Sequence, residues 1–345
     1  MDDKHNSTKD VILQDVRNGK ERPWRRKKVR SLILANSLKR LGYDKRSERV
    51  KMCGTFLEFR ILLNNVMKLL KANFCLFSLC PMCQWRKSLK IAFQVARVMD
   101  LIQIRFANFV PLFLTLTLKN CAVADISAYL DVLFSGWREF ERSKKLKTLV
   151  KGYFRAVEIT YDGEKTITQR RYEKNQAYYD CKGLKVEDPN PNFDTFHPHI
   201  HVIILVDKSY FETGYIETKE WSEMWKKAAK LDYNPVVDIR ACRSERGKRK
   251  EVAEVAKYTL KDTQILRAND DVLTDRLVDA LSVALFKRRL FAYGGVMREI
   301  AKELGMDKPG EGDLIHIDDK TIRADVAVQV ERYRWRFGIA NYVRF

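Results

Sequence analysis

The chain has 345 residues, 46% of them hydrophobic, which suits one large or two to three smaller folded domains and excludes a disordered protein. Its formal net charge of +20 indicates a polyanionic partner, with nucleic acid expected before an anionic membrane surface. No apolar run reaches the roughly 18 residues that span a bilayer, so we expect no membrane-spanning segment. Of the two polyanionic partners we therefore expect nucleic acid and no membrane. The polar N-terminus and seven cysteines argue against secretion and a disulfide scaffold, so we expect a cytoplasmic protein.

The first 50 residues form a basic arm whose densest run begins at Arg25. From Ser31 to Arg40 the apolar residues have helical spacing, so the arm should lead into a helix. Basic side chains here would suit contacts with nucleic-acid phosphates, although a solvated tail would have the same composition. The candidates are Arg25, Arg26, Lys27 and Lys28.

Four of the seven cysteines lie in residues 51–105, where we also expect a long helix from Trp85 to about Arg105. Cys80 and Cys83 form a CxxC pair, with Cys75 and Cys53 upstream. Four thiolates in tetrahedral geometry are the usual structural zinc site. The pattern therefore predicts a zinc-binding region, with buried free cysteines as the alternative. Two further basic candidates for phosphate contacts follow the pair, Arg86 and Lys87.

Residues 106–265 show strand and helix patterns that mostly alternate. In chain order we expect a strand at 113–118, a helix from 126 to about 150, strands at 153–161 and 200–206, a helix at 218–231, a strand at 236–239 and a helix at 251–261. The second and third strands can pair as a hairpin across a polar connection. This order predicts an α+β fold with a central antiparallel sheet of four to five strands and helices. Residues 266–345 are expected to form a helical C-terminal region that contacts DNA or a partner, with helices at 272–290 and 297–304.

Three of the five histidines stand at alternate positions in His197-Pro-His-Ile-His201, directly before an apolar run that predicts a buried strand. Because side chains alternate faces along a strand, His199 and His201 should point the same way. Two neighbouring imidazoles suit a divalent metal, and histidines that are merely hydrogen-bonded are the alternative.

Glu254 and Tyr258 share one face of the helix expected at 251–261, and Lys257 and Lys261 lie nearby. A phenol becomes a nucleophile when a cation stabilises the phenolate or a base removes its proton. In a basic protein this set suits attack on a phosphodiester, although a Glu/Tyr pair on a helix is usually structural. The loop before the helix offers phosphate contacts from Arg243, Arg246, Lys248, Arg249 and Lys250.

Three stretches taken in order resemble the motifs of rolling-circle plasmid replication initiators of the HUH endonuclease superfamily. They are Phe113-Leu-Thr-Leu-Thr-Leu118, His197-Pro-His-Ile-His-Val202 and Glu254-Val-Ala-Lys-Tyr258. Stretches beginning at Cys53 and Cys80 resemble one branch, found on small plasmids of Gram-positive bacteria, that uses a single tyrosine with a nearby glutamate. The similarity covers about residues 50–305 and implies an antiparallel sheet related to ferredoxin-like and RNA-recognition (RRM) folds.

The resemblance also implies a reaction at the double-strand origin of the plasmid. Tyr258 would attack the scissile phosphate, become linked to the 5′ phosphate and leave a 3′-OH primer. Glu254 would activate water at termination. His199 and His201 would hold Mg²⁺ or Mn²⁺, and Glu158, on the preceding strand, would be the third ligand as in relatives. His197, Thr115, Thr117, Lys257 and Lys261 are possible supporting residues.

The same resemblance implies plasmid origin DNA, both duplex and extruded single strand, as the substrate. The host replicative helicase and single-strand binding protein would be partners. The alternatives are a conjugative relaxase or a single-tyrosine transposase of the same superfamily. A non-catalytic zinc-dependent DNA-binding regulator is the alternative from another class.

Overall fold

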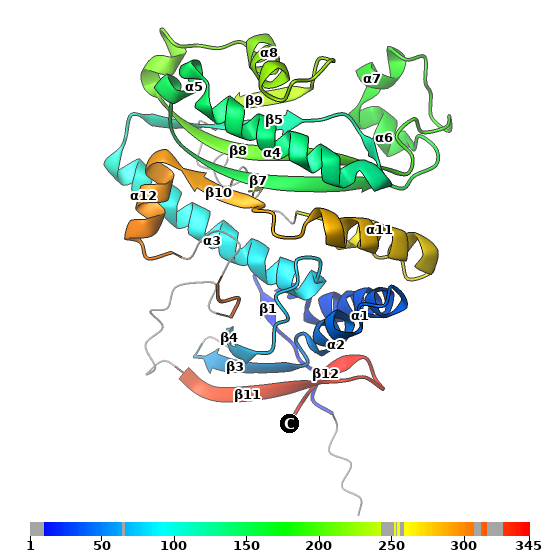
Figure 1. The fold of residues 1–345 in the computed structure, drawn as a ribbon. Helices are drawn as coiled ribbons and strands as arrows, with labels where there is room; N and C mark the ends of the chain where they lie inside the picture. The colour runs from blue at the N-terminus through cyan, green and yellow to red at the C-terminus, as the bar shows by residue number, and fades with distance from the viewer. Residues whose placement is uncertain are drawn as a thin grey trace, which may run out of the picture. The chain divides into compact units, whose positions relative to one another are not determined.

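The computed structural model describes residues 10–63, 66–242, 252, 254–255, 259–306, 312–315 and 327–345. The contacts within it divide the chain into two units (Figure 1). Unit 1 consists of Met1–Lys90 together with Gly312–Phe345, and unit 2 is Ile91–Glu311. The division falls within helix α3 (Pro81–Arg105). Within the described residues, no helix has the length and apolar character needed to cross a membrane.

Unit 1 contains a sheet with the strand order β12-β11-β3-β4, in which every pairing is antiparallel. Its strands are β3 (Phe56–Leu62), β4 (Met67–Ala72), β11 (Ala327–Arg336) and β12 (Asn341–Arg344). The remaining elements are the short hairpin β1 (Val16–Arg17) and β2 (Lys20–Glu21) and the helices α1 (Trp24–Arg40) and α2 (Asp44–Met52). The basic run from Arg25 is therefore helical from its start.

The expectation of a helical C-terminal region is wrong for β11 and β12. Tyr333 and Trp335 are buried while Arg332, Arg334 and Arg336 between and beside them are exposed, which is the period-two burial of a strand. The arginines obscure this alternation in the sequence. The strand with which β11 pairs is β3, which is remote in sequence, so no local pattern marks the pairing.

Unit 2 is built on a sheet of six strands among the described residues, with the order β10-β7-β8-β5-β9 and with β6 paired to β8. The strands are β5 (Phe109–Thr117), β6 (Cys121–Ala122), β7 (Val150–Asp162), β8 (Thr195–Asp207), β9 (Val237–Ala241) and β10 (Phe291–Gly294). All pairings are antiparallel, which confirms the predicted α+β class and the hairpin of β7 with β8. The described sheet has six strands instead of the predicted four to five. β6 and β10 were not expected, because β6 has only two residues and the four residues of β10 look like a break between two helices.

Helices cover both faces of this sheet (Figure 1). Ile203 and Leu205 of β8 pack into one core with Val95 and Val98 of α3 and Met297 of α12 (Gly295–Glu303). On the opposite face, α4 (Ile126–Arg142) packs against α8 (Thr218–Ala228) through aromatic side chains, and α4 also contacts β8. This two-sided burial explains why the strand after the histidines is a continuous apolar run.

The other helical elements that are described in full are short or lie at the edges of unit 2. They are η1 (Val123–Asp125), α5 (Lys144–Leu149), α6 (Gln169–Lys174), α7 (Gln176–Asp180), η2 (Lys208–Phe211), α10 (Asp262–Ile265) and α11 (Asp271–Ala284). The helix expected from 126 to about 150 is thus interrupted at Ser143, and the polar hairpin connection contains α6 and α7. Gly295 has φ +53° and a Cβ there would lie 2.3 Å from Lys151 O, so the turn from β10 into α12 requires glycine.

Candidate functional site

The histidines of β8 lie in register with two neighbouring strands of unit 2. His199 is opposite Glu158 of β7 on one side and Thr117 of β5 on the other. His201 is likewise opposite Thr115 of β5. Because directly opposite residues of an antiparallel pair share a sheet face, these side chains gather on the face that α3 and α12 cover further along.

Three of these side chains form a compact group of metal-binding atoms. Glu158 Oε2 lies 3.0 Å from His201 Nε2 and 3.3 Å from His199 Nε2, and the two Nε2 atoms are 3.1 Å apart. An octahedral ion with bonds of about 2.1 Å has neighbouring ligands about 3.0 Å apart. The group therefore fits three ligands of an octahedral divalent ion, with three positions left for water or substrate.

The second nitrogen of each imidazole has a partner that fixes the ring. His199 Nδ1 lies 3.2 Å from His197 O, and His201 Nδ1 lies 3.0 Å from Thr115 Oγ1. Such contacts fix the orientation of each imidazole ring and leave its Nε2 available to bind a metal. The Phe113 ring, 5.3 Å from the His201 ring, packs on the same side, a contact the sequence motif did not single out.

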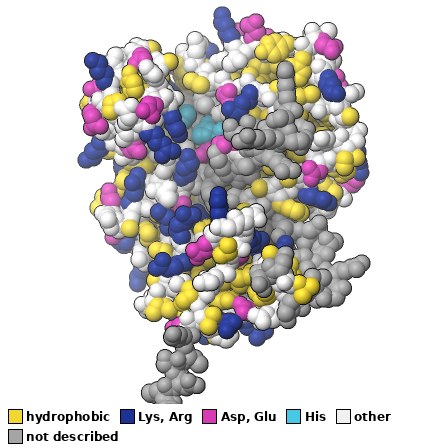
Figure 2. Space-filling view, turned by 180° about the vertical axis from the view of Figure 1, so that it is seen from behind, with side chains coloured by type: hydrophobic (Ala, Val, Ile, Leu, Met, Phe, Trp, Pro, Cys, Tyr) yellow, Lys and Arg dark blue, Asp and Glu magenta, His cyan; other side chains and the backbone are white. Residues whose placement is uncertain are grey.

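The electrostatics of the group favour an ionised carboxylate. Burial alone would raise the pKa of Glu158, but hydrogen bonds with His199 and His201 bring it well below its ordinary value. Lys261 Nζ, on a half-exposed side chain, lies 3.8 Å from Glu158 Oε1. Figure 2 shows the histidine side chains recessed on one face of the molecule, among basic and acidic side chains.

His197 and Thr117 lie beside the group without belonging to it. The ligand atoms that lie within 4.8 Å of one another come from Glu158, His199 and His201. Burial and the neighbouring His199 lower the pKa of His197 to about 4, so this imidazole is neutral at physiological pH. Thr117 Oγ1 donates to Val236 O instead of to a histidine.

The segment expected to carry the tyrosine is described only in part. Val252, Glu254 and Val255 are helical, and both valines are buried in the core on the histidine side of the sheet. Ile159, next to Glu158, donates its N–H to Thr259 O, and Leu260 bridges to Ile159. Tyr258, Lys257 and the basic loop with Arg243, Arg246, Lys248, Arg249 and Lys250 lie outside the described residues.

The four cysteines predicted to bind zinc come together in unit 1. The Sγ atoms of Cys53 and Cys83 are 3.5 Å apart, those of Cys53 and Cys80 are 3.6 Å apart, and those of Cys75 and Cys83 are 3.7 Å apart. Tetrahedral zinc with bonds of about 2.3 Å has sulfurs about 3.8 Å apart. All four residues are at most 7% exposed, and they fit a closed four-thiolate site.

The basic residues proposed to contact DNA differ sharply in burial. Arg25 and Arg26 are exposed on α1, and Lys87 is partly exposed on α3. Lys28 is fully buried, with a pKa that burial lowers to about 8 against the opposing effect of nearby cysteines, and Lys27 is 5% exposed. Arg86 is 2% exposed and donates to Leu314 O and Ile315 O. We therefore restrict the prediction of phosphate contacts among these residues to Arg25, Arg26 and Lys87.

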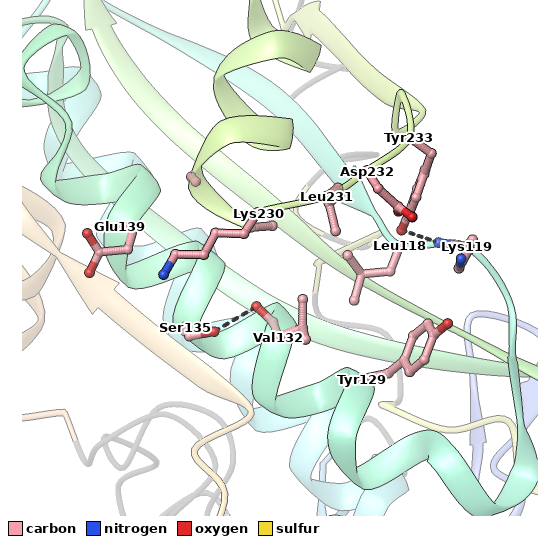
Figure 3. Close-up of a pocket in the computed structure, with 12 residues that line it drawn as sticks. Leu118, Lys119, Tyr129, Val132, Ser135, Glu139, Lys230, Leu231, Asp232 and Tyr233 are labelled. Carbon is pink, nitrogen blue, oxygen red and sulfur yellow. Dashed lines mark hydrogen bonds between the residues drawn. The ribbon is translucent and has the colours of Figure 1, made fainter.

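A surface pocket of about 770 Å³ opens in unit 2 between α4 and the chain after α8 (Figure 3). It is lined by Tyr129 and Val132 of α4, by Lys230 and Tyr233, and by Lys119, whose N–H donates to the Tyr233 hydroxyl. Glu158, His199 and His201 do not line it. This cavity is therefore separate from the group of Glu158, His199 and His201.

Comparison with known proteins identifies the family. A family model described as "Replication protein" matches residues 66–343. The chain belongs to this replication protein family. It is 36% identical to a "Protein rep" of Bacillus amyloliquefaciens over 96% of this chain and 97% of that protein, and 34% identical to a "Protein rep" of Streptococcus pneumoniae over 90% and 88%. A "Replication protein" of Staphylococcus aureus is 32% identical over 60% of this chain and 79% of that protein. No solved structure matches the chain.

Proposed function

We propose that this protein initiates rolling-circle replication of a plasmid by nicking one strand of the double-strand origin. The observation that carries the proposal is the group of Glu158, His199 and His201 on one face of the unit 2 sheet, in a member of the replication protein family. The net charge of +20 supports a nucleic-acid substrate. We assign the nicking reaction to residues 106–265 and its superfamily to the HUH endonucleases.

In the proposed reaction, the Tyr258 oxygen attacks the scissile phosphorus. A bond forms between this oxygen and phosphorus while the bond from phosphorus to the 3′ oxygen breaks. The Tyr258 hydroxyl loses its proton in this step, and the released 3′ oxygen takes one up, so the proton count balances. The 3′-OH becomes the primer for leading-strand synthesis, and the 5′ phosphate stays on Tyr258. Support comes from Thr259, next in the chain, whose carbonyl accepts a hydrogen bond from Ile159 beside Glu158.

The metal-ligand group would bind Mg²⁺ or Mn²⁺ through one carboxylate oxygen and two imidazole nitrogens. A bound divalent ion would act as a Lewis acid on the phosphate oxygens and orient the scissile bond. Thr115 and the carbonyl of His197 hold the two imidazoles in position. The half-exposed Lys261 lies beside Glu158. Its ammonium would attract an anionic substrate that binds at Glu158, His199 and His201.

Glu254 is proposed to act at termination. It is partly exposed on a helix whose Val252 and Val255 pack into the core on the histidine side of the sheet. A carboxylate on this helix would remove a proton from water, which then cleaves the second phosphodiester without leaving another tyrosyl link. The cysteine group of unit 1 is proposed to hold structural zinc, and the host helicase and single-strand binding protein are proposed partners.

The deciding experiment uses purified protein, Mn²⁺ and a supercoiled plasmid that carries the cognate origin. We expect a nicked product, and mass spectrometry of an adduct with an origin oligonucleotide should place the 5′ phosphate on Tyr258. Tyr258→Phe should bind the origin and form no adduct. An adduct that still forms in this variant would show that Tyr258 is not the nucleophile. Origin binding by wild type without any nicking would favour the alternative of a non-catalytic DNA-binding regulator.

A second variant separates initiation from termination. Glu254→Ala should nick the origin at a rate close to that of wild type. After one round of replication it should accumulate nicked plasmid from which the single-stranded circle has not been released. The readout is the ratio of nicked plasmid to released single-stranded circles in a replication extract. Normal release would contradict the proposed role of Glu254.

A further inference from the structure

Lys28 is a fully buried lysine next to the four cysteines of unit 1. Its Nζ donates to Cys53 O at 2.8 Å and to Lys51 O at 2.5 Å, and its side chain has no exposed surface. A buried ammonium group is unfavourable unless negative charge or several hydrogen bonds compensate it. Two carbonyl oxygens satisfy two of its three donors but bring no net charge.

The cysteine group is where a compensating charge would arise. Four thiolates around one divalent ion carry a net charge of −2, and all four sulfurs here are in buried residues. A buried dianion is as unfavourable as a buried ammonium group, so each would stabilise the other at short range. Lys28 is a buried ammonium that contacts the backbone of a cysteine in this group.

Helix α1 makes a second contact with the group, one turn further along. Ser31 is fully buried; its hydroxyl donates to Lys27 O at 2.9 Å, and the same Oγ lies 3.5 Å from Cys80 Sγ. Lys28 and Ser31 are spaced i and i+3, so one face of α1 meets the cysteine group at both residues. The same helix exposes Arg25 and Arg26 elsewhere on its surface.

We propose that Lys28 is the counter-cation of the four-cysteine metal site, and that Lys28 and Ser31 together fasten α1 to the metal-loaded group. This rests on the proposed metal site in unit 1 and is independent of the nicking chemistry in unit 2. The site then holds zinc tightly only when α1 is docked. Lys28 is a positioning residue, since its ammonium acts on the metal through the ligands.

The test measures metal affinity in the full-length chain. Metal-free wild type, Lys28→Met, Lys28→Arg and Lys90→Met are titrated with Co²⁺, whose sulfur-to-metal charge-transfer band reports thiolate ligation. Zinc dissociation constants follow from competition with a chelating dye. Lys90 is the matched control, because it is also buried and donates from Nζ to a backbone carbonyl, that of Asp313.

We expect Lys28→Met to weaken zinc binding by about 10- to 100-fold, the usual cost of losing a partner of the metal ligands. Lys28→Arg should recover most of the affinity, and Lys90→Met should stay within about twofold of wild type. Equal zinc affinity in Lys28→Met and wild type would refute the proposal. So would an equal loss in Lys90→Met, because the effect would then come from removing any buried lysine.

If Lys28→Met does not fold, as judged by far-ultraviolet circular dichroism, Ser31→Ala and Lys28→Arg decide the matter. Ser31→Ala should weaken zinc binding by about threefold to tenfold with the fold intact, and no change would overturn the fastening role. Failure of wild type to bind Co²⁺ or Zn²⁺ would also overturn the proposal. Origin nicking, measured on the same sample, would show whether the proposed function survives.

Discussion

The described residues contain two groups that could hold a metal ion, one in each unit, and these groups differ in their donor atoms and hardly in their burial. The four cysteines are at most 7% exposed, and His199 and His201 are 8% exposed. Four thiolates complete a tetrahedral shell and leave no position for a substrate. One carboxylate and two imidazoles fill only half of an octahedral shell. The two groups are buried to a similar extent. It is therefore the number and kind of their ligands that make one group suited to stabilising the fold and the other suited to binding a substrate at the metal.

The groups also arise in different ways. Glu158, His199 and His201 meet through the register of two paired strands, so the rigid sheet sets their spacing. Cys53 directly follows α2, and Cys75 lies in the loop between β4 and α3, so a metal could draw these segments together. The first group should therefore persist without metal, whereas the second should depend on it. Each prediction below tests one side of this contrast.

The largest effect is expected from His201→Ala. Losing one of three ligands should reduce Mn²⁺-dependent nicking of origin plasmid by about 1,000-fold, because the Lewis-acid contribution to phosphate transfer amounts to several kcal/mol. Zinc content, measured by atomic absorption, should stay at the wild-type value. A loss of zinc together with activity would mean that the two groups are not independent.

Cys80→Ser should have the opposite effect, with zinc binding lost and cleavage by unit 2 retained. Structural zinc contributes about 10 kcal/mol or more to small zinc-dependent folds, so we expect unit 1 to lose zinc and melt at a much lower temperature. Cleavage of a short single-stranded origin oligonucleotide, which needs only unit 2, should stay within about tenfold of wild type. The measurements are calorimetry with and without chelator and a gel-based cleavage assay. Complete loss of oligonucleotide cleavage would contradict the view that the cysteine group stabilises unit 1 without taking part in the reaction of unit 2.

Thr115→Val should weaken Mn²⁺ binding by about tenfold, since the hydroxyl that orients His201 is removed at constant shape. Isothermal titration calorimetry measures the affinity. Thr117→Val is the matched control, because Thr117 lies on the same strand and its hydroxyl donates to Val236 O. Equal losses in both variants would show that the effect belongs to the strand and not to the contact with His201.

The smallest effect is expected from Lys261→Met. Its ammonium lies 3.8 Å from Glu158 Oε1 on a side chain that is 49% exposed, so it repels a bound cation only weakly. Removing it should tighten Mn²⁺ binding by about twofold to fivefold, more at low salt than at high salt. Titration at two ionic strengths checks this, and weaker binding in the variant would contradict it.

Much of unit 2 could be predicted from local sequence. The alternation in β5 and the apolar run of β8 indicate strands without any knowledge of the strands they pair with. Likewise, α3 ends at Arg105, as its apolar spacing predicts. Unit 1 was harder to predict. β3 and β4 were not anticipated, because charged residues interrupt their apolar pattern and because β3 pairs with β11, at the other end of the chain. Such pairing leaves no local signal.

The sequence by itself determined what depends on backbone periodicity. Alternate spacing places His199 and His201 on one face of a strand, and a CxxC turn places Cys80 beside Cys83. Only the tertiary structure decided that Glu158 lies opposite His199, that Cys53 joins the other cysteines, and that Lys28 is buried while Arg25 is exposed. The physical reason is that strand register and the burial of a charge depend on contacts between residues far apart in sequence, which local patterns do not encode.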